Sequence, residues 1–242
     1  MGPERKGSAV GRRYVLAAAV LWSLSGVVAK SLDLDGLSIA FYRSLFAGLA
    51  LLPFVPRARW EFRWAMLPNV MTFGAMIGLF IAAMQLTTAA NAIFLQCTAT
   101  LWMVPLSFVL LGERPDRRSL LGIAIAMVGI ILIVARGRLG RPGEGLGIGL
   151  ALASGVAYAW VAVGLRRFRG LDPTWLSAVN NLGGALAIGA YTTLAGPGLA
   201  RPNATEAGVL AAFGVVQMAV PYALFARGLR DLGAPEAGLI GL

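Results

Sequence analysis

The chain is 242 residues long; 58% of the residues are hydrophobic and only 13% are charged. Soluble domains carry about 25% charged residues, so this composition is typical of a membrane protein. The formal net charge is +10, but the basic residues form no surface large enough to bind nucleic acid, and a role in orienting membrane helices explains them better. The sequence has no histidine and a single cysteine, Cys97, which excludes disulfides, the usual zinc sites, and His-based relays or triads.

A polar tail, residues 1–13, precedes the first apolar run. That run also fits a signal peptide, because basic residues precede it and small residues follow, but the many later spans favour a membrane helix. A run of about 20 apolar residues crosses the ~30 Å core of a bilayer. The predicted helices are residues 14–30, 37–56, 65–85, 91–111, 119–135, 146–165, 174–195 and 206–226, with a last apolar run at 233–242.

The connections between these runs are short and rich in turn-forming residues, so successive helices are expected to run antiparallel. Basic residues cluster at alternate ends, which favours a cytoplasmic N-terminus and a multi-pass protein of the bacterial inner membrane. The clusters on the predicted cytoplasmic side are Arg57/Arg59/Arg63, Arg114/Arg117/Arg118, Arg166/Arg167/Arg169 and Arg227/Arg230. Arg136, Arg138 and Arg141 lie on the other side and are exceptions to this rule.

The second half of the chain weakly repeats the first. Residues 17–30 are similar to 151–164, 37–56 to 174–195, and 85–95 to 228–240. Five predicted helices separate the copies, and because five is odd the second copy enters the membrane inverted. Inverted repeats are typical of secondary transporters, although chance similarity between Ala/Gly/Leu-rich helices is the alternative.

Helices interrupted by Gly or Pro at matching positions of two repeats indicate a transporter's binding site. Gly74 and Gly78 interrupt the third predicted helix, and Gln217 and Pro221 stand in the eighth. Pro221 removes a backbone donor, and paired small residues allow close helix packing, which is also the alternative role of the glycines. Arg43 is the one basic residue well inside a span. It is a candidate ligand for a substrate carboxylate, unless it extends to the interface or pairs with Asp33 or Asp35.

Three segments together resemble the EamA family of the drug/metabolite transporter superfamily. They are LWSLSGVVAKSL with Trp22, FYRSLFAGLALL with Arg43, and residues 89–134 with Glu113 in an LGE turn. The resemblance covers nearly the whole chain and implies ten helices as two inverted five-helix repeats. The sequence departs from the family pattern in two places. A proline expected early in the fourth helix is missing near residues 98–100, with Pro105 further on, and the sequence stops inside the ninth helix without the tenth.

The predicted fold is therefore an all-α polytopic bundle with a first repeat at 14–135 and a second repeat at 146–242 that stops in its fourth helix, so that about eight and a half helices are present. If the resemblance holds, polar and aromatic residues of the first, fourth, sixth and eighth helices line a central cavity; interhelical hydrogen bonding is the alternative. With Arg43, the candidate substrate-binding residues are Trp22, Ser23, Ser25, Asn91, Gln96, Tyr158, Gln217 and Tyr222, and the candidate hinge or packing residues are Gly74, Gly78, Pro105 and Pro221.

The resemblance implies a transporter that exports small neutral or zwitterionic metabolites, such as amino acids, by alternating access. The alternative is a non-transporting membrane scaffold or a pore-forming subunit. The Asp and Glu residues lie in tails, turns or helix ends, so we predict no enzyme, no metal and no cofactor. The expected partners are the small-molecule substrate and the lipid bilayer, with a homodimer left open and nucleic acid excluded. Energy coupling is also open, because only Glu236 approaches a span.

Overall fold

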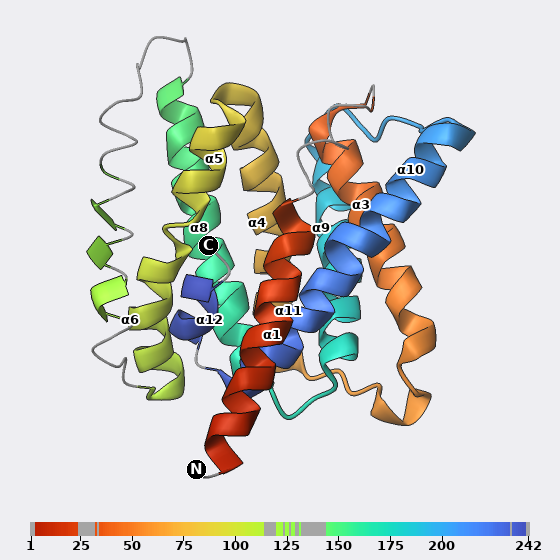
Figure 1. The fold of residues 1–242 in the computed structure, drawn as a ribbon. Helices are drawn as coiled ribbons and strands as arrows, with labels where there is room; N and C mark the ends of the chain where they lie inside the picture. The colour runs from red at the N-terminus through yellow and green to blue at the C-terminus, as the bar shows by residue number, and fades with distance from the viewer. Residues whose placement is uncertain are drawn as a thin grey trace.

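A computed structural model describes residues 3–23, 32, 34–113, 120–122, 124–125, 127–128, 131, 144–232 and 234–240. All regular structure in these residues is helical, which confirms the predicted all-α bundle (Figure 1). Five helical segments in this part of the chain are long and apolar enough to cross a membrane. The α-helices are α1 (Pro3–Ser23), α3 (Gly36–Leu51), α4 (Leu67–Leu86), α5 (Ala89–Gln96), α6 (Ala99–Leu111), α8 (Glu144–Arg167), α9 (Pro173–Leu194), α10 (Ala204–Gly214), α11 (Val220–Asp231) and α12 (Ala234–Ile240).

Most helix ends lie close to the predicted ones, with differences at the first, second and eighth helices. Helix α1 begins at Pro3, so residues predicted as a polar tail continue the first helix. A proline fits the first turn of a helix, where no backbone donor is needed. After α3 the chain tightens into short 3₁₀ turns at Leu52–Phe54, Arg57–Arg59 and Trp64–Met66. Of the predicted helix 119–135, the described residues are helical and the others lie outside the described part.

The fourth span is two helices rather than the single one predicted. Helix α5 ends at Gln96, α6 begins at Ala99, and the intervening Thr98 hydroxyl donates to the Leu95 carbonyl over 2.6 Å. Such a local side-chain bond competes with the helical ladder. Gly155 of α8 packs against the break, because a Cβ there would lie 2.7 Å from the Thr98 hydroxyl. A side chain at position 155 would therefore not fit beside the interrupted helix.

The eighth span is continuous but irregular. Between α10 and α11 the chain forms a π-helical segment, Val215–Ala219, directly before Pro221. Proline has no N–H, so the carbonyl one turn earlier, at Gln217, loses its helical donor. A π-bulge is one of the ways in which a helix accommodates such a loss. The interruption that Pro221 predicted is therefore present as a π-segment.

The packing of the helices follows the proposed repeat. Helix α1 lies along α11, α8 along α4, and α3 along α9 (Figure 1). In the proposed repeat, α1 corresponds to α8, α3 to α9, and α4 to the span formed by α10 and α11. Exchanging each helix with its counterpart therefore turns the pair α1–α11 into the pair α8–α4 and leaves the pair α3–α9 unchanged. Glycines allow close approach in both of the first two pairs: a Cβ on Gly11 would lie 3.1 Å from a side-chain atom of Leu232, and one on Gly147 would lie 2.9 Å from a side-chain atom of Leu86. This pairing of helices is the one expected of two inverted copies that pack against each other.

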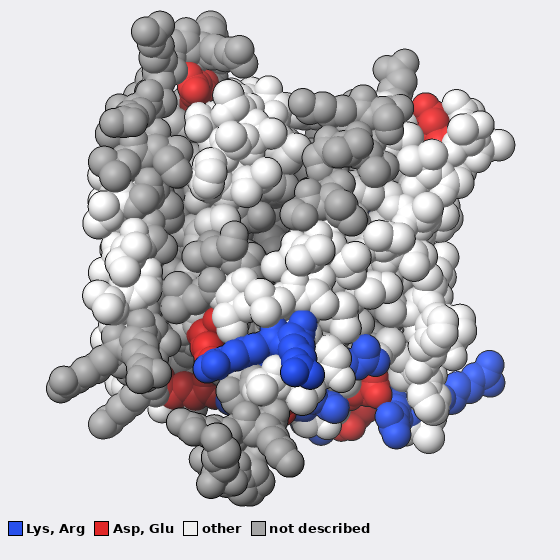
Figure 2. Space-filling model, in the orientation of Figure 1, with Lys and Arg blue, Asp and Glu red and all other residues white. Residues whose placement is uncertain are grey.

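Charged side chains gather at one end of the bundle, where the N-terminus also lies (Figure 2). We call this the basic end; it contains Arg12, Arg59, Arg63, Arg166, Arg227 and Arg230. The chain is antiparallel, so α3, α8 and α10 begin at the opposite end, beside Asp35, Glu144 and Glu206. Between the two ends, the described residues on the face shown in Figure 2 are almost free of charge, as a bilayer requires.

Candidate functional site

An aromatic cluster lies where the two halves of the bundle meet. The Trp22 ring of α1 lies 6.3 Å from Tyr158 of α8, 5.1 Å from Tyr222 and 5.4 Å from Phe225 of α11, measured between centroids. Phe73 of α4 approaches Tyr222 edge-on at 5.0 Å. Edge-to-face contacts of this kind add specificity to apolar packing. Three of the predicted site residues, Trp22, Tyr158 and Tyr222, therefore lie together.

Gln217 connects this cluster to the irregular part of the eighth span. Its amide nitrogen donates to the backbone carbonyls of Leu21 and Trp22, both over 3.2 Å. Gln217 is buried and lies in the π-helical segment, which turns its side chain toward the end of α1. Both carbonyls belong to the last described turn of α1, which is described as far as Ser23. Gln217 thus joins the first helix to the eighth span.

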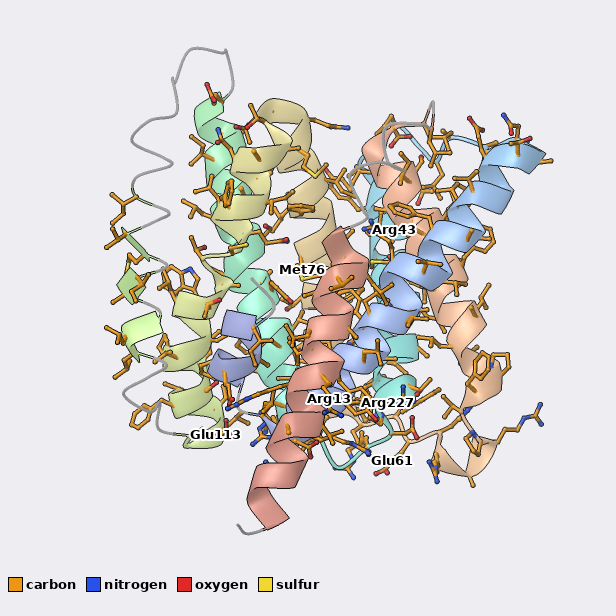
Figure 3. The ribbon with its side chains drawn as sticks, viewed as in Figure 1. Arg13, Arg43, Glu61, Met76, Glu113 and Arg227 are labelled. Carbon is orange, nitrogen blue, oxygen red and sulfur yellow. The ribbon has the colours of Figure 1, made fainter. Side chains whose placement is uncertain are left out.

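Arg43 lies in the half of the bundle away from the basic end (Figure 3). Its guanidinium carbon is 5.2 Å from the centroid of the Phe213 ring, a cation–π arrangement. The buried Nε of Arg43 has no hydrogen-bond partner among the described residues. The alternative partner Asp35 accepts instead from the backbone N–H of Ser38 at the start of α3, and Asp33 lies outside the described residues.

Contacts between spans extend on either side of this cluster. The guanidinium of Arg43 in α3 lies over the ring of Phe213 in α10, and Tyr222 of α11 follows in the same span. One turn before Tyr158, Gly155 of α8 packs against the Thr98 hydroxyl and the Gln96 carbonyl, on either side of Cys97. Contacts therefore link the second span to the eighth and the fourth span to the sixth. A cation and aromatic rings are groups that can hold a small molecule with a carboxylate and an apolar part.

Other predicted site residues lie elsewhere or are only partly described. Asn91 stands in the first turn of α5, where its amide donates to the Thr87 hydroxyl over 3.3 Å, a local contact at the helix start. Gln96 is the last residue of α5 and is half-buried, with its carbonyl close to Gly155. Ser23 ends α1, with its side chain outside the description, and Ser25 lies outside the described residues.

The predicted hinge residues take different roles. A Cβ on Gly74 would lie 3.1 Å from the Gly184 carbonyl, so α4 and α9 are in near-backbone contact there, whereas Gly78 has only Leu37 at an ordinary 3.9 Å. Pro105 lies inside α6. The counterpart of Gly74 in the second repeat is Gly214, because both follow a phenylalanine and both face the second helix of the other repeat. A Cβ on Gly214 would lie 2.5 Å from the Arg43 carbonyl.

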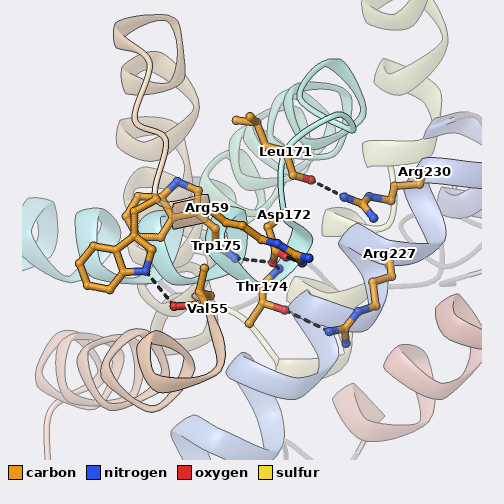
Figure 4. Close-up of polar contacts among 9 residues, drawn as sticks. Val55, Arg59, Leu171, Asp172, Thr174, Trp175, Arg227 and Arg230 are labelled. Carbon is orange, nitrogen blue, oxygen red and sulfur yellow. Dashed lines mark hydrogen bonds and ion pairs between the residues drawn. The ribbon is translucent and has the colours of Figure 1, made fainter. Parts of the chain in front are cut away.

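A polar network joins the two halves at the basic end (Figure 4). Asp172 caps α9 by accepting from the N–H groups of Thr174 and Trp175, and it also accepts from Arg59 over 3.1 Å. Partial burial opposes ionisation of this carboxyl, but the hydrogen bonds from Trp175, Arg59 and Thr174 prevail and hold the pKa of Asp172 below its ordinary value. The carboxylate of Asp172 therefore stays charged.

Several residues of the site gave no signal in the sequence. Phe73, Phe213 and Phe225 are ordinary apolar residues in apolar helices, and only the repeated Phe-Gly dipeptide could have indicated two of them. Asn69 and Asn180 join α4 to α9 through a buried amide pair, with 3.3 Å between the Asn69 nitrogen and the Asn180 oxygen. Within the described part of the chain, no group of three His, Cys, Asp or Glu side chains is placed to hold a metal ion.

Comparisons with known proteins agree with this arrangement. A family profile described as the EamA-like transporter family matches the chain twice, over residues 10–135 and 145–242. An uncharacterized transporter of Archaeoglobus fulgidus is 29% identical over 235 residues, which cover 96% of this chain and 82% of that protein. A solved structure titled only "Crystal structure of protein" superposes with a TM-score of 0.79 at 17% identity, covering 98% of this chain and 83% of the other. The chain is therefore a multi-pass membrane protein that belongs to the EamA-like transporter family of the drug/metabolite transporter superfamily.

Proposed function

We propose that this transporter exports small metabolites that carry a carboxylate, amino acids or similar zwitterionic compounds, by alternating access. The observation that carries the proposal is the buried Arg43, which lies over the Phe213 ring and whose Nε has no hydrogen-bond partner among the described residues. A buried cation without an anionic partner in the described part of the chain costs several kcal/mol, and a bound carboxylate would offset this cost. The rings of Trp22 and Tyr158 would pack on the apolar part of the substrate.

Alternating access is supported by the packing of the two halves. The pairs α1–α11 and α8–α4 are counterparts, so rocking one half on the other exchanges two similar arrangements. Interruptions at Cys97–Thr98 and Val215–Ala219 lie in two spans that contribute to the site. Glu236 accepts from Arg12 over 2.8 Å at the basic end, and the buried Glu144 is the first residue of α8. The described carboxylates lie at the ends of the spans rather than midway along them, which favours transport down the substrate gradient.

The orientation that fits this function places the basic end and the N-terminus in the cytoplasm of a bacterial inner membrane. Arginines at that end outnumber those at the opposite end, where Arg201 is the one in the described residues. Short loops retain basic residues on the cytoplasmic side. Export would then carry the substrate from the basic end to the opposite end.

The test is counterflow of radiolabelled amino acids in proteoliposomes by the wild type and Arg43→Lys. Lysine keeps the charge but loses the planar fork that binds a carboxylate in bidentate fashion, so we expect transport to fall about tenfold. Arg63→Lys is the matched control, because Arg63 is exposed and pairs with Glu61 in its own loop. Equal transport by Arg43→Lys and the control, at equal protein levels, would show that Arg43 does not bind the substrate.

The same assay separates a carrier from the other classes. Substrate on the far side should accelerate exchange, because a loaded carrier reorients with its cargo. A pore would give flux without this trans-stimulation, and a scaffold would give no flux for any compound in a panel of amino acids, amines and nucleosides.

A further inference from the structure

At the basic end, the loop after α3 contacts the start of α9. The Arg59 guanidinium lies 3.1 Å from the Asp172 carboxylate. The Trp60 and Trp175 rings stack, with centroids 5.2 Å apart and planes 17° from parallel. The Trp175 indole also donates to the Glu61 carbonyl over 2.8 Å. We call these five residues the latch; it joins the first repeat to the second, and Figure 4 shows its ion pair between Arg59 and Asp172.

The opposite end has a counterpart of this contact. Helix α3 is capped by Asp35 as α9 is capped by Asp172, and Ser38 stands three residues after its cap as Trp175 does. The hydroxyl of Ser38 accepts from the N–H of Ala200, in the connection between α9 and α10, over 2.9 Å. Each connecting loop therefore contacts the same position of its partner helix, as the pseudo-two-fold axis requires.

Among the described residues the two contacts differ in strength. At the opposite end these residues provide one hydrogen bond between loop and helix, and the Asp35 side chain accepts from the backbone N–H of Ser38 in its own helix. The latch combines an ion pair, a ring stack and a hydrogen bond.

Two further bonds at the basic end connect the end of α11 to the region around the start of α9. Arg227 donates to the Thr174 hydroxyl over 3.1 Å, and Arg230 donates to the Leu171 carbonyl over 2.6 Å. Three separate parts of the chain are thus joined at the basic end.

We propose that the latch keeps the basic end closed in the resting transporter, so that the resting state is accessible from the opposite end. The inference rests on the proposed alternating access, in which one end must open as the other closes. Two similar halves would divide the population evenly between the two states, and the unequal end contacts remove this balance. Each transport cycle must then break the latch to admit substrate from the basic end.

The chain's own cysteine reports which end is open. Cys97 lies at the break in the fourth span, where the flanking Gln96 and Thr98 pack against α8 one turn before Tyr158, and Cys97→Ser provides the blank. Its labelling by a membrane-impermeant methanethiosulfonate is measured from each side, in vesicles of both orientations. The side of the basic end is identified by labelling Gly170→Cys in the Cys97→Ser background. Arg59→Gln removes the ion pair, and Asp172→Asn does so while an Asn oxygen can still cap α9.

We expect either variant to raise labelling from the basic end about two- to fivefold, the range that a solvent-exposed ion pair supports, and to lower it from the opposite end. Trp175→Phe, which removes the indole N–H, should add to the effect. Asp35→Asn at the counterpart cap and Arg63→Gln in the same loop are the matched controls and should leave the rates unchanged.

Unchanged rates in Arg59→Gln and Asp172→Asn would overturn the latch, as would an equal rise from both sides, which indicates a loosened fold. A second measurement uses the double variant Arg59→Cys with Asp172→Cys in the Cys97→Ser background. A short bifunctional methanethiosulfonate should cross-link the two new cysteines in the resting protein. Failure to cross-link them would also count against the latch. If the variants change Cys97 labelling from the two sides as expected but no counterflow is measured, the latch is upheld and the proposed transport is rejected. If counterflow is measured but Cys97 labelling does not change between the two sides, the transport is upheld and the latch is rejected.

Discussion

At the scale of single residues, one of the tightest described interior contacts is between a glycine and a buried amide. Gly164 of α8 faces Asn69 of α4, and a Cβ at position 164 would lie 1.9 Å from the Asn69 side-chain oxygen. The Asn69 nitrogen is already bound to Asn180 of α9, so Asn69 cannot turn away without losing that bond. The packing of α4, α8 and α9 at this point therefore requires that position 164 carry no side chain.

Gly164→Ala should lower the free energy of unfolding by about 1–3 kcal/mol, because the added methyl group displaces Asn69 from its bond with Asn180. The measurement is the thermal midpoint of the purified protein in detergent. Gly149→Ala in the same helix is the control: no atom lies within 4 Å of its added Cβ, so it should be neutral or slightly stabilising. A midpoint for Gly164→Ala equal to that of Gly149→Ala would contradict the predicted clash.

At the scale of elements, the sequence predicted the spans well because apolar length alone determines them. The ends of α4, α8 and α9 lie within two residues of the predicted ones. The break at Cys97–Thr98 could not be predicted, because it depends on a threonine bond and on a glycine from another helix. The π-segment was indicated by Pro221, whose missing donor is visible in the sequence, but its effect on Gln217 was not.

Pro221→Ala should separate stability from transport. An alanine restores the donor to the Gln217 carbonyl, so the π-segment can relax into an α-helix, which is the more stable form by up to ~3 kcal/mol. Relaxation rotates Gln217 away from the carbonyls of Leu21 and Trp22 and disturbs the aromatic cluster. We expect an unchanged or higher thermal midpoint together with a clear loss of counterflow. Full counterflow would show that the π-segment is not required for transport.

At the scale of the whole molecule, the helix packing fits the repeat proposed from the sequence, but in a different residue register in the third and eighth helices. Gly74 and Gly78 were matched with Gln217 and Pro221, whereas the packing matches Gly74 with Gly214. Similar apolar helices can be aligned in several registers, and only contacts with neighbouring helices distinguish them. The candidate site was predicted in part: Trp22, Tyr158, Gln217 and Tyr222 converge because polar and aromatic groups turn inward in a lipid-facing bundle.

The orientation of the molecule gives a test at the same scale. In the Cys97→Ser background, Gly170→Cys at the basic end and Thr205→Cys at the start of α10 place single thiols at opposite ends on exposed residues. With the basic end in the cytoplasm, an impermeant maleimide added to intact cells should label Thr205→Cys and spare Gly170→Cys until the membrane is permeabilised. Labelling of Gly170→Cys in intact cells, with Thr205→Cys protected, would reverse the proposed direction of transport.

The pairing of α3 with its own counterpart α9 has a further consequence. The two helices approach closely: a Cβ on Gly48 would lie 2.5 Å from a Leu182 side-chain atom. Because α3 and α9 correspond to each other in the proposed repeat, their pairing is kept when the two halves exchange arrangements. A larger residue at position 48 would therefore act on both end states, whereas a change in the latch acts only on the state in which the basic end is closed.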